Sequence, residues 1–312
     1  MSTLAVSPKP TLFASLKLLV VRHPFIAYFT IAYGCTWLLM LPLLLSNDGF
    51  GVLPFTPPMV MDGVLGLVAT LAGPSLAAIL VTAALEGKTG VRQFLRRYRQ
   101  WRADIRAYLI ILVGYPLFFA ALDSVFVGPT TLWHELMAHW STWFTTYWPM
   151  ILLFPGIIHW GEEPGWRGFA QWRMQTAYGA LRASLIVGLL HGAWHLPAFL
   201  LSGGPMAMGP FDPQWFVVDV LDIMLSAVVL ACIFNLARGS ILVAILSHAG
   251  YTAADNWVGG LIPKALVDQV NLWHWRYTQL GFLVVIALVV IVLTKGRLGY
   301  QPTEQTQQNG KP

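Results

Sequence analysis

Long apolar runs are the feature that most constrains how this chain can fold. Eight mostly apolar segments follow one another, at about residues 24–45, 60–85, 107–127, 147–160, 183–201, 215–236, 240–258 and 278–294. A helix that spans a membrane needs roughly 20 such residues. Charged residues make up only 11% of the chain, whereas soluble domains carry about 25%. The sequence therefore predicts an all-α, polytopic membrane helix bundle with about eight transmembrane helices.

The basic residues indicate how this bundle is oriented. With the N-terminus in the cytoplasm and eight crossings, 17 of the 19 lysines and arginines fall on the cytoplasmic side, all except Lys264 and Arg276. Cytoplasmic loops of membrane proteins carry this excess of positive charge. We expect both termini in the cytoplasm of a multi-pass protein, in a bacterial cell membrane. The net charge of +5 is then a membrane-flanking charge that contacts lipids, and no nucleic-acid partner is expected.

Three parts of the chain follow from this pattern. Residues 1–23 form a cytoplasmic N-terminal segment, residues 24–294 the transmembrane bundle, and residues 295–312 a polar cytoplasmic tail that we expect to be disordered. Gly73-Pro74 is expected to kink the second run, and Pro197 to bend or end the fifth. The two cysteines lie in apolar runs, so no disulfide or cysteine-metal framework is predicted.

A cluster of charged residues directly follows the fourth run, in the sequence Gly161-Glu-Glu-Pro-Gly-Trp-Arg-Gly168. Charges beside lipid are costly and indicate a functional site by default. Glu163 and Arg167 are spaced i,i+4, so they share a helix face and can pair. Glu162 points about 100° away from Glu163, so we expect the two carboxylates to have different roles. The alternative is a charge cluster at the cytoplasmic surface.

Pro164 predicts a local break in this segment. Proline has no N–H to donate to the carbonyl of Trp160, so the helix should be kinked or restarted here. A restarted helix would place both carboxylates at its positive N-terminal end.

Histidines in later apolar runs supply groups that the carboxylates lack. His191 and His195 are spaced i,i+4, like the histidines of helical zinc sites, but without the glutamate between them. Glu162 is available as the remote base. His248 lies in the seventh run beside the small residues Ala249 and Gly250. Hydrogen bonds between helices are the alternative explanation for such histidines.

Other polar residues are weaker candidates. We interpret His134, Glu135 and His139 as a solvated or interfacial group in an outer segment. Asp219 and Asp222, near the start of the sixth run, could face either a cavity or the outer interface.

Together these motifs resemble the CPBP family, the intramembrane proteases that include the CAAX prenyl endopeptidases and bacteriocin-processing proteins and are also called the Abi family. The first motif matches at Glu162-Glu163-x-x-x-Arg167. In the second motif, His195 matches and His191 occupies the usual aromatic position. In the third, His248 matches and Thr252 stands where asparagine is usual. The resemblance covers about residues 161–256, within a protease-like core of about 147–258.

The resemblance implies an intramembrane endopeptidase that cleaves a membrane-proximal peptide bond in a peptide or protein substrate, including lipidated ones. The implied site residues are Glu162, Glu163, Arg167, His195 and His248, with His191, Thr252 and Asn256 as accessory residues. Two imidazoles and a carboxylate suit catalytic Zn²⁺, which would be held by His195, His248 and Glu162. A mechanism that depends on glutamate without metal is the alternative.

Two other functions stay open at this point. One is a non-catalytic bacteriocin-immunity or membrane scaffold protein of the same fold, and the other is a proton-coupled transporter, because chains of intramembrane glutamates and histidines also relay protons. An enclosed cluster of Glu162, His195 and His248 would favour the enzyme, whereas a polar path to both faces would favour transport. We expect that cluster in a water-filled cavity open to the cytoplasm.

Overall fold

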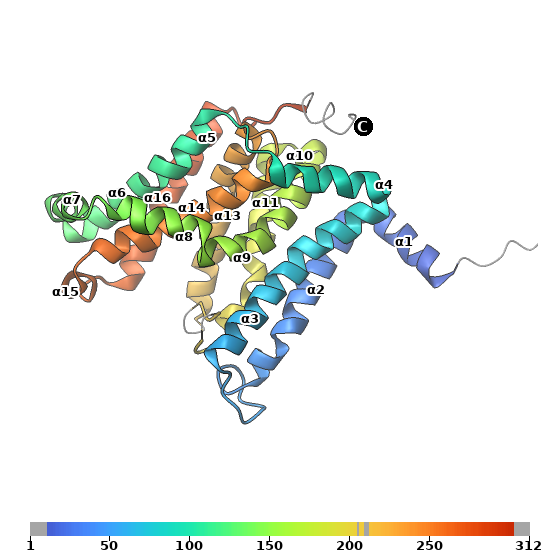
Figure 1. The fold of residues 1–312 in the computed structure, drawn as a ribbon, viewed down its shortest axis with the longest axis horizontal. Coiled ribbons are helices and arrows are strands. Elements are labelled where there is room, and N and C mark those ends of the chain that lie inside the picture. Colours follow the sequence, from blue (N-terminus) through green and yellow to red (C-terminus); the bar gives the residue numbers. More distant parts are fainter. Residues whose placement is uncertain (1–10, 205, 209–211, 303–312) are drawn as a thin grey trace, which may run out of the picture.

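The computed structural model describes residues 11–204, 206–208 and 212–302, which form helices joined by short segments, with no β-strand in these ranges (Figure 1). The α-helices are α1 (Leu12–Arg22), α2 (Pro24–Leu45), α3 (Met59–Thr70), α4 (Leu76–Arg96), α5 (Ile105–Leu109), α6 (Tyr115–Val127), α7 (Pro129–Ala138), α8 (Trp148–Leu152), α9 (Phe154–Glu163), α10 (Trp172–Tyr178), α11 (Ala180–Trp194), α12 (Leu196–Phe199), α13 (Pro213–Leu236), α14 (Ile241–Leu261), α15 (Lys264–Val267) and α16 (Leu272–Leu293). Segments of wider π-helix join several of them, so many consecutive elements continue one long helix.

Five helical stretches are long and apolar enough to cross a membrane: Pro24–Leu45, Met59–Arg99, Ile105–Val127, Pro213–Leu236 and Leu272–Leu293. They coincide with the first, second, third, sixth and eighth predicted runs. The other three predicted runs lie in α8–α9, α11–α12 and α14, which carry the glutamates and histidines of the predicted site. The predicted all-α membrane bundle is confirmed, while the count of eight crossings and the cytoplasmic termini stay predictions.

The bundle has two different ends. At one end, Arg97 Nε donates to the carbonyl of Gly239 (2.8 Å), and Asn235 Nδ2 donates to the carbonyl of Leu298 (3.0 Å). At the opposite end, the backbone N–H of Ser202 donates to the carbonyl of Asp48 (2.6 Å) and joins two loops. In Figure 1 these are the upper end, near α4, α5 and α10, and the lower end, near the start of α3. The basic residues 92–106 gather at the first end, as the orientation argument expects.

The first part of the predicted tail differs from its expected disorder. Leu298 is fully buried, and its carbonyl accepts the bond from Asn235 on α13. The Tyr300 hydroxyl lies 3.2 Å from that of Thr176 on α10. Residues 295–302 therefore pack against the bundle, and residues 303–312 lie outside the described chain.

The kink predicted at Gly73-Pro74 takes the form of a π-helical turn, Leu71–Ser75, between α3 and α4. The helix continues through this turn into α4, because the wider turn accommodates the proline without ending the helix. Its Ser75 hydroxyl reaches α9, where it donates to the carbonyl of Gly161 (2.8 Å) and lies 3.3 Å from that of Trp160.

The helix around Pro164 differs from part of what the sequence predicted. The chain does not restart a helix before the two glutamates; α9 runs through Glu163 and continues into the π-helical segment Pro164–Gln171. Both carboxylates therefore lie at the C-terminal end of α9. Of the two outcomes predicted at Pro164, a kink or a restarted helix, the restart is wrong, and so is the N-terminal support that it would have given the carboxylates. The Trp160 carbonyl, which proline cannot bond, faces the Ser75 hydroxyl instead.

Glycines let α9, which carries the glutamates, and α11, which carries His191, approach their neighbours closely. A Cβ at Gly161 would lie 2.8 Å from the carbonyl carbon of Thr70, and one at Gly165 would lie 2.5 Å from Pro74 Cβ. On α11, a Cβ at Gly192 would lie 2.9 Å from Val220 Cα on α13. Small residues four apart are typical of close helix pairs in membranes. The close packing fixes where α9 and α11 present their polar side chains.

Candidate active site

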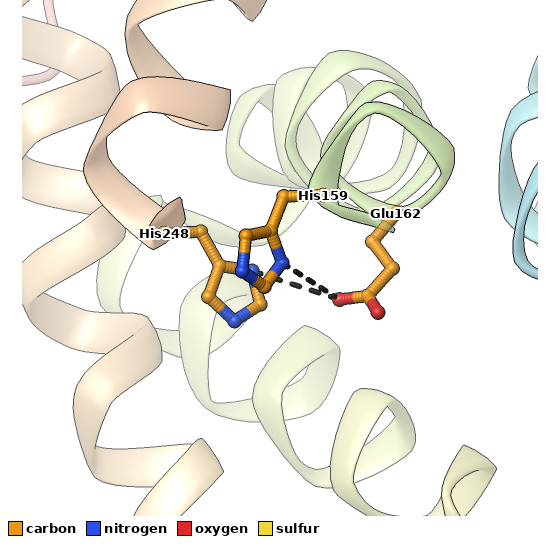
Figure 2. A group of neighbouring side chains, drawn as sticks. All are labelled: His159, Glu162 and His248. Atoms are coloured by element: carbon orange, nitrogen blue, oxygen red, sulfur yellow. Dashed lines mark ion pairs between the residues drawn. The ribbon is translucent and has the colours of Figure 1, made fainter. Parts of the chain in front are cut away.

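Glu162 is the centre of the polar cluster inside the bundle. Its carboxylate is buried, with 4% of the residue exposed. Its Oε2 lies 3.3 Å from His191 Nε2 on α11, 3.6 Å from His248 Nδ1 on α14 and 3.8 Å from His159 Nδ1 on α9. Figure 2 shows the His159 and His248 rings turned toward this oxygen. Within the described chain, no group forms a hydrogen bond to Oε2.

Glu163 occupies a different environment from its neighbour. Its Oε1 lies 3.1 Å from Arg167 Nη1 and 2.8 Å from His248 Nδ1. Glu163 is fully buried and Arg167 is 2% exposed, so the i,i+4 pair expected from the sequence is present inside the protein. A carboxylate bonded to one ring nitrogen fixes the orientation of the imidazole. Glu163 therefore holds His248 while Arg167 neutralises the charge of Glu163.

His191 and His195 reach the cluster from the end of α11. The His191 ring stacks on Trp166, with ring centres 4.8 Å apart, and its Nδ1 lies 3.4 Å from Arg167 Nη1. Arginine can only donate, so His191 Nδ1 is the acceptor and the ring hydrogen is on Nε2, facing Glu162. The His195 ring centre lies 5.1 Å from that of His191. His195 is the residue between the end of α11 and the start of α12.

His159 belongs to the cluster and was missed by the sequence analysis. Its ring stacks on His248, with centres 3.8 Å apart, and its Nε2 lies 3.3 Å from the Thr252 hydroxyl. The signal was available, because a histidine three residues before Glu162 shares its helix face. Thr252 thus reaches the cluster through His159. Asn256 does not, since it is exposed and its amide donates to the Thr252 carbonyl (2.8 Å).

Two groups of side chains could bind a metal ion, one of His159, Glu162 and His248 and the other of Glu162, His191 and His195. In each group the ligand atoms lie within 4.8 Å of one another. The trio implied by the resemblance, Glu162, His195 and His248, is divided between these two groups. In the second group, His191 Nδ1 accepts the bond from Arg167, so the His191 nitrogen that faces Glu162 carries a hydrogen and has no lone pair for a metal. The arrangement therefore does not fit the implied catalytic Zn²⁺ in its expected trio.

A cavity of about 160 Å³ adjoins Glu162 and His195. Its other walls are mainly apolar and come from α2, α3, α9, α11, α12 and the loop after α12, including Met40, Ile158, Trp194, Met206 and Met208. The sequence predicted a water-filled cavity open to the cytoplasm. This cavity adjoins the loop after α12. Which side of the membrane that loop faces depends on the orientation of the bundle, so the opening to the cytoplasm stays a prediction.

The remaining candidates lie elsewhere. Asp219 and Asp222 face the interior, where Arg276 on α16 lies 2.9 Å from Asp219 Oδ1 and 3.1 Å from Asp222 Oδ2. His134 and His139 are exposed, in agreement with a solvated role, and they lie 3.8 and 3.6 Å from Glu135.

Comparisons with known proteins point to the same segment. Residues 141–254 match the model of a family described as type II CAAX prenyl endopeptidase Rce1-like. A protein of Methanococcus maripaludis named CAAX prenyl protease 2 is 27% identical over 88 residues, which are 28% of this chain and 32% of that protein. The match thus spans about a third of this relative's length. Both matches confirm the resemblance to the CPBP family of intramembrane proteases, over the segment that carries the glutamates and histidines.

Proposed function

We propose that this protein is an intramembrane endopeptidase of the CAAX-protease type, which hydrolyses a peptide bond with water activated by Glu162 and His195. The observation that carries the proposal is the position of Glu162. It is a buried carboxylate with an unbonded oxygen, within the described chain, surrounded by imidazoles from three helices of a membrane bundle. A base in such a position can take a proton from water that enters the apolar cavity.

The neighbouring groups suit complementary tasks. Glu162 Oε2 accepts the proton of the attacking water and returns it to the amine nitrogen that leaves when the peptide bond breaks. The His191 ring lies against this carboxylate, with Nε2 3.3 Å from Oε2, and limits its position by contact. Glu163 stabilises a protonated His248 through the 2.8 Å contact at Nδ1. The other ring nitrogen of His248 then carries a hydrogen that can polarise the carbonyl oxygen of the scissile bond. We derive no step through Zn²⁺, because the implied trio is divided between two groups.

The cavity beside Glu162 and His195 supports the proposal that the substrate is apolar at the cleavage site. About 160 Å³ with mainly apolar walls suits an aliphatic side chain next to the scissile bond. We therefore propose peptide or protein substrates with apolar residues at the cleavage site, including lipidated ones, as the names of the similar proteins suggest.

The test is cleavage of a panel of apolar peptides, with and without a prenyl group, by the purified full-length protein in detergent. Glu162→Gln should lower the cleavage rate by about 10²–10⁴-fold, the range for loss of general acid–base catalysis. Glu135→Gln, the same change in the outer segment, should leave the rate unchanged. If wild-type protein cleaves none of the panel, or Glu162→Gln cleaves normally, the proposal fails.

A further inference from the structure

A second cavity, which we call the arginine cavity, lies at the end of the bundle where the basic residues 92–106 gather. Its volume is about 260 Å³, and its walls come from α4, the short turn after it, the π-helical segment Pro164–Gln171 and α10. A buried water needs only about 10–15 Å³ of such space, so the cavity has room for a ligand of several heavy atoms. Its charged walls are Arg97, Arg173 and Glu86, and the proposed reaction uses none of them.

Arg97 brings to this cavity a guanidinium whose hydrogen-bonding capacity is only partly used. Its Nε donates to the carbonyl of Gly239 and its Nη1 to that of Gly168, both at 2.8 Å. The third nitrogen, Nη2, is buried and has no hydrogen-bond partner among the groups that the structure describes. Arginine has five N–H donors and no acceptor. A buried charged donor left unpaired is costly, so this position favours a ligand that supplies acceptor atoms.

The hydroxyl of Thr82 is a second unpaired group in the same walls. Thr82 is 1% exposed, and its Oγ1 has no partner in the described part of the chain. Threonines inside a helix often bond back to the preceding turn, as Thr70 does to the carbonyl of Gly66 and Thr278 to that of His274, both at 2.8 Å. Thr82 makes no such bond, so its hydrogen is available to an acceptor in the cavity.

Arg173 gives the cavity an excess of positive charge. Its Nη2 donates to Glu86 Oε1 at 2.6 Å, and the two side chains are 25% and 41% exposed. An ion pair this exposed contributes little free energy, so an anion of higher charge can displace the carboxylate. Two arginines against one carboxylate leave a net positive charge. The planar fork of arginine matches the oxygens of phosphate groups.

We propose that the arginine cavity is a binding site for a phosphate group, held by Arg97, Arg173 and Thr82. A phosphate supplies both the negative charge and the several acceptor oxygens that these donors lack. Two sources carry this chemistry, the headgroup of an anionic phospholipid, which basic residues at a membrane surface attract, and a soluble phosphate. Arg97 joins the turn after α4 to Gly168 and Gly239. A ligand that binds this joint only in the folded protein should raise its melting temperature.

The first arm of the test uses inorganic phosphate and the purified, delipidated full-length protein in detergent. Thermal unfolding is followed as phosphate is added, against sodium chloride and sodium acetate of equal ionic strength. The melting temperature of wild type should rise with phosphate and not with the other two salts. Arg173→Gln should weaken this response. Arg92→Gln removes the same charge from an exposed arginine of α4 that does not line the cavity, so it should respond like wild type.

Two further variants separate binding from folding. Thr82→Val keeps the shape of the side chain and removes a hydroxyl that has no partner, so its melting temperature in chloride should not fall. Its phosphate affinity should fall at least about tenfold, the effect of losing a hydrogen bond to a charged group. Glu86→Gln frees Arg173 from its competing carboxylate and should raise the affinity by up to about fivefold, the range for an exposed ion pair.

The second arm identifies the source of the phosphate. Short-chain phosphatidylglycerol is added to the detergent solution, with a diacylglycerol of the same chain length as the control without phosphate. Stabilisation by phosphatidylglycerol at lower concentrations than inorganic phosphate, weakened by Thr82→Val, would identify a phospholipid headgroup, and the reverse order a soluble phosphate. No stabilisation in either arm would overturn the site. Stabilisation that Thr82→Val and Arg173→Gln leave unchanged would overturn it as well.

Discussion

At the scale of single residues, two adjacent glutamates have contrasting surroundings. Glu163 lies between Arg167 and His248, at 3.1 and 2.8 Å. Glu162 is surrounded by imidazoles, and its Oε2 is without a hydrogen bond among the described groups. The difference follows from the helix, because neighbours in sequence point about 100° apart. A bonded carboxylate suits a fixed support, whereas an unbonded one suits proton transfer.

Removal of the Glu163 charge should therefore affect stability as well as rate. Glu163→Gln leaves the buried Arg167 without its ion partner, and breaking a buried pair costs about 3–5 kcal/mol. We expect a clearly lower melting temperature in detergent and slower cleavage. Glu162→Gln, by contrast, should lose cleavage and keep a near-normal melting temperature. A fully stable but inactive Glu163→Gln, beside an active Glu162→Gln, would show that the two roles are reversed.

Exchange of the two charges gives a second test of the same pair. Glu163→Arg combined with Arg167→Glu restores an i,i+4 ion pair, so the double variant should be more stable than either single variant. It should not recover cleavage, because an arginine at position 163 cannot accept the bond from His248 Nδ1. Full recovery of the rate would mean that Glu163 does not orient His248.

Spacing alone could predict part of this cluster. The i,i+4 rule indicated the pair of Glu163 and Arg167, and the two histidine motifs pointed to His195 and His248. His159 belongs to none of the three motifs, so only its i,i+3 spacing from Glu162 could have indicated it. Asn256, eight positions after His248, points about 80° away from it around a helix, so spacing could have indicated that it leaves the cluster's face.

At the scale of elements, the site depends on a close contact between α9 and the π-helical turn at residues 71–75. A Cβ at Gly161 would approach the backbone atoms Thr70 C and Leu71 N at 2.8 and 2.9 Å. Backbone atoms cannot move aside as a flexible side chain can. Prolines in the sequence predicted that both helices are disturbed, but propensity could not tell a kink from a π-helical turn, which depends on the partner helix.

Alanine substitutions should report on this contact. Gly161→Ala should lower the free energy of unfolding by about 1–3 kcal/mol, the usual cost of overpacking, and slow cleavage by displacing Glu162. Gly63→Ala on α3 is the control, since a Cβ there meets no described atom within 4 Å and alanine favours helix. Thermal unfolding in detergent compares the two, and equal melting temperatures would mean that the contact is looser than the structure indicates.

At the scale of the whole molecule, the prediction that remains to be measured is the direction of the chain in the membrane. Single cysteines at Lys88 and Lys264, in a protein whose own Cys35 and Cys232 are replaced, can be labelled with a membrane-impermeant maleimide in intact cells. Both lysines are exposed. The positive-inside rule predicts labelling from outside at position 264 and none at position 88. Labelling of position 88 in intact cells would reverse the orientation.

The packing of α9 also bears on how such proteins can diverge. The matched segment begins at residue 141, yet the turn that supports Gly161 lies at residues 71–75 and makes this contact largely through backbone atoms. A support built from main chain places few demands on side-chain identity. The side chains of residues 70 and 71 can therefore change while this main-chain support of Gly161 stays in place. The corollary is that residues 141–254 transplanted alone would carry the motif without the support that positions it.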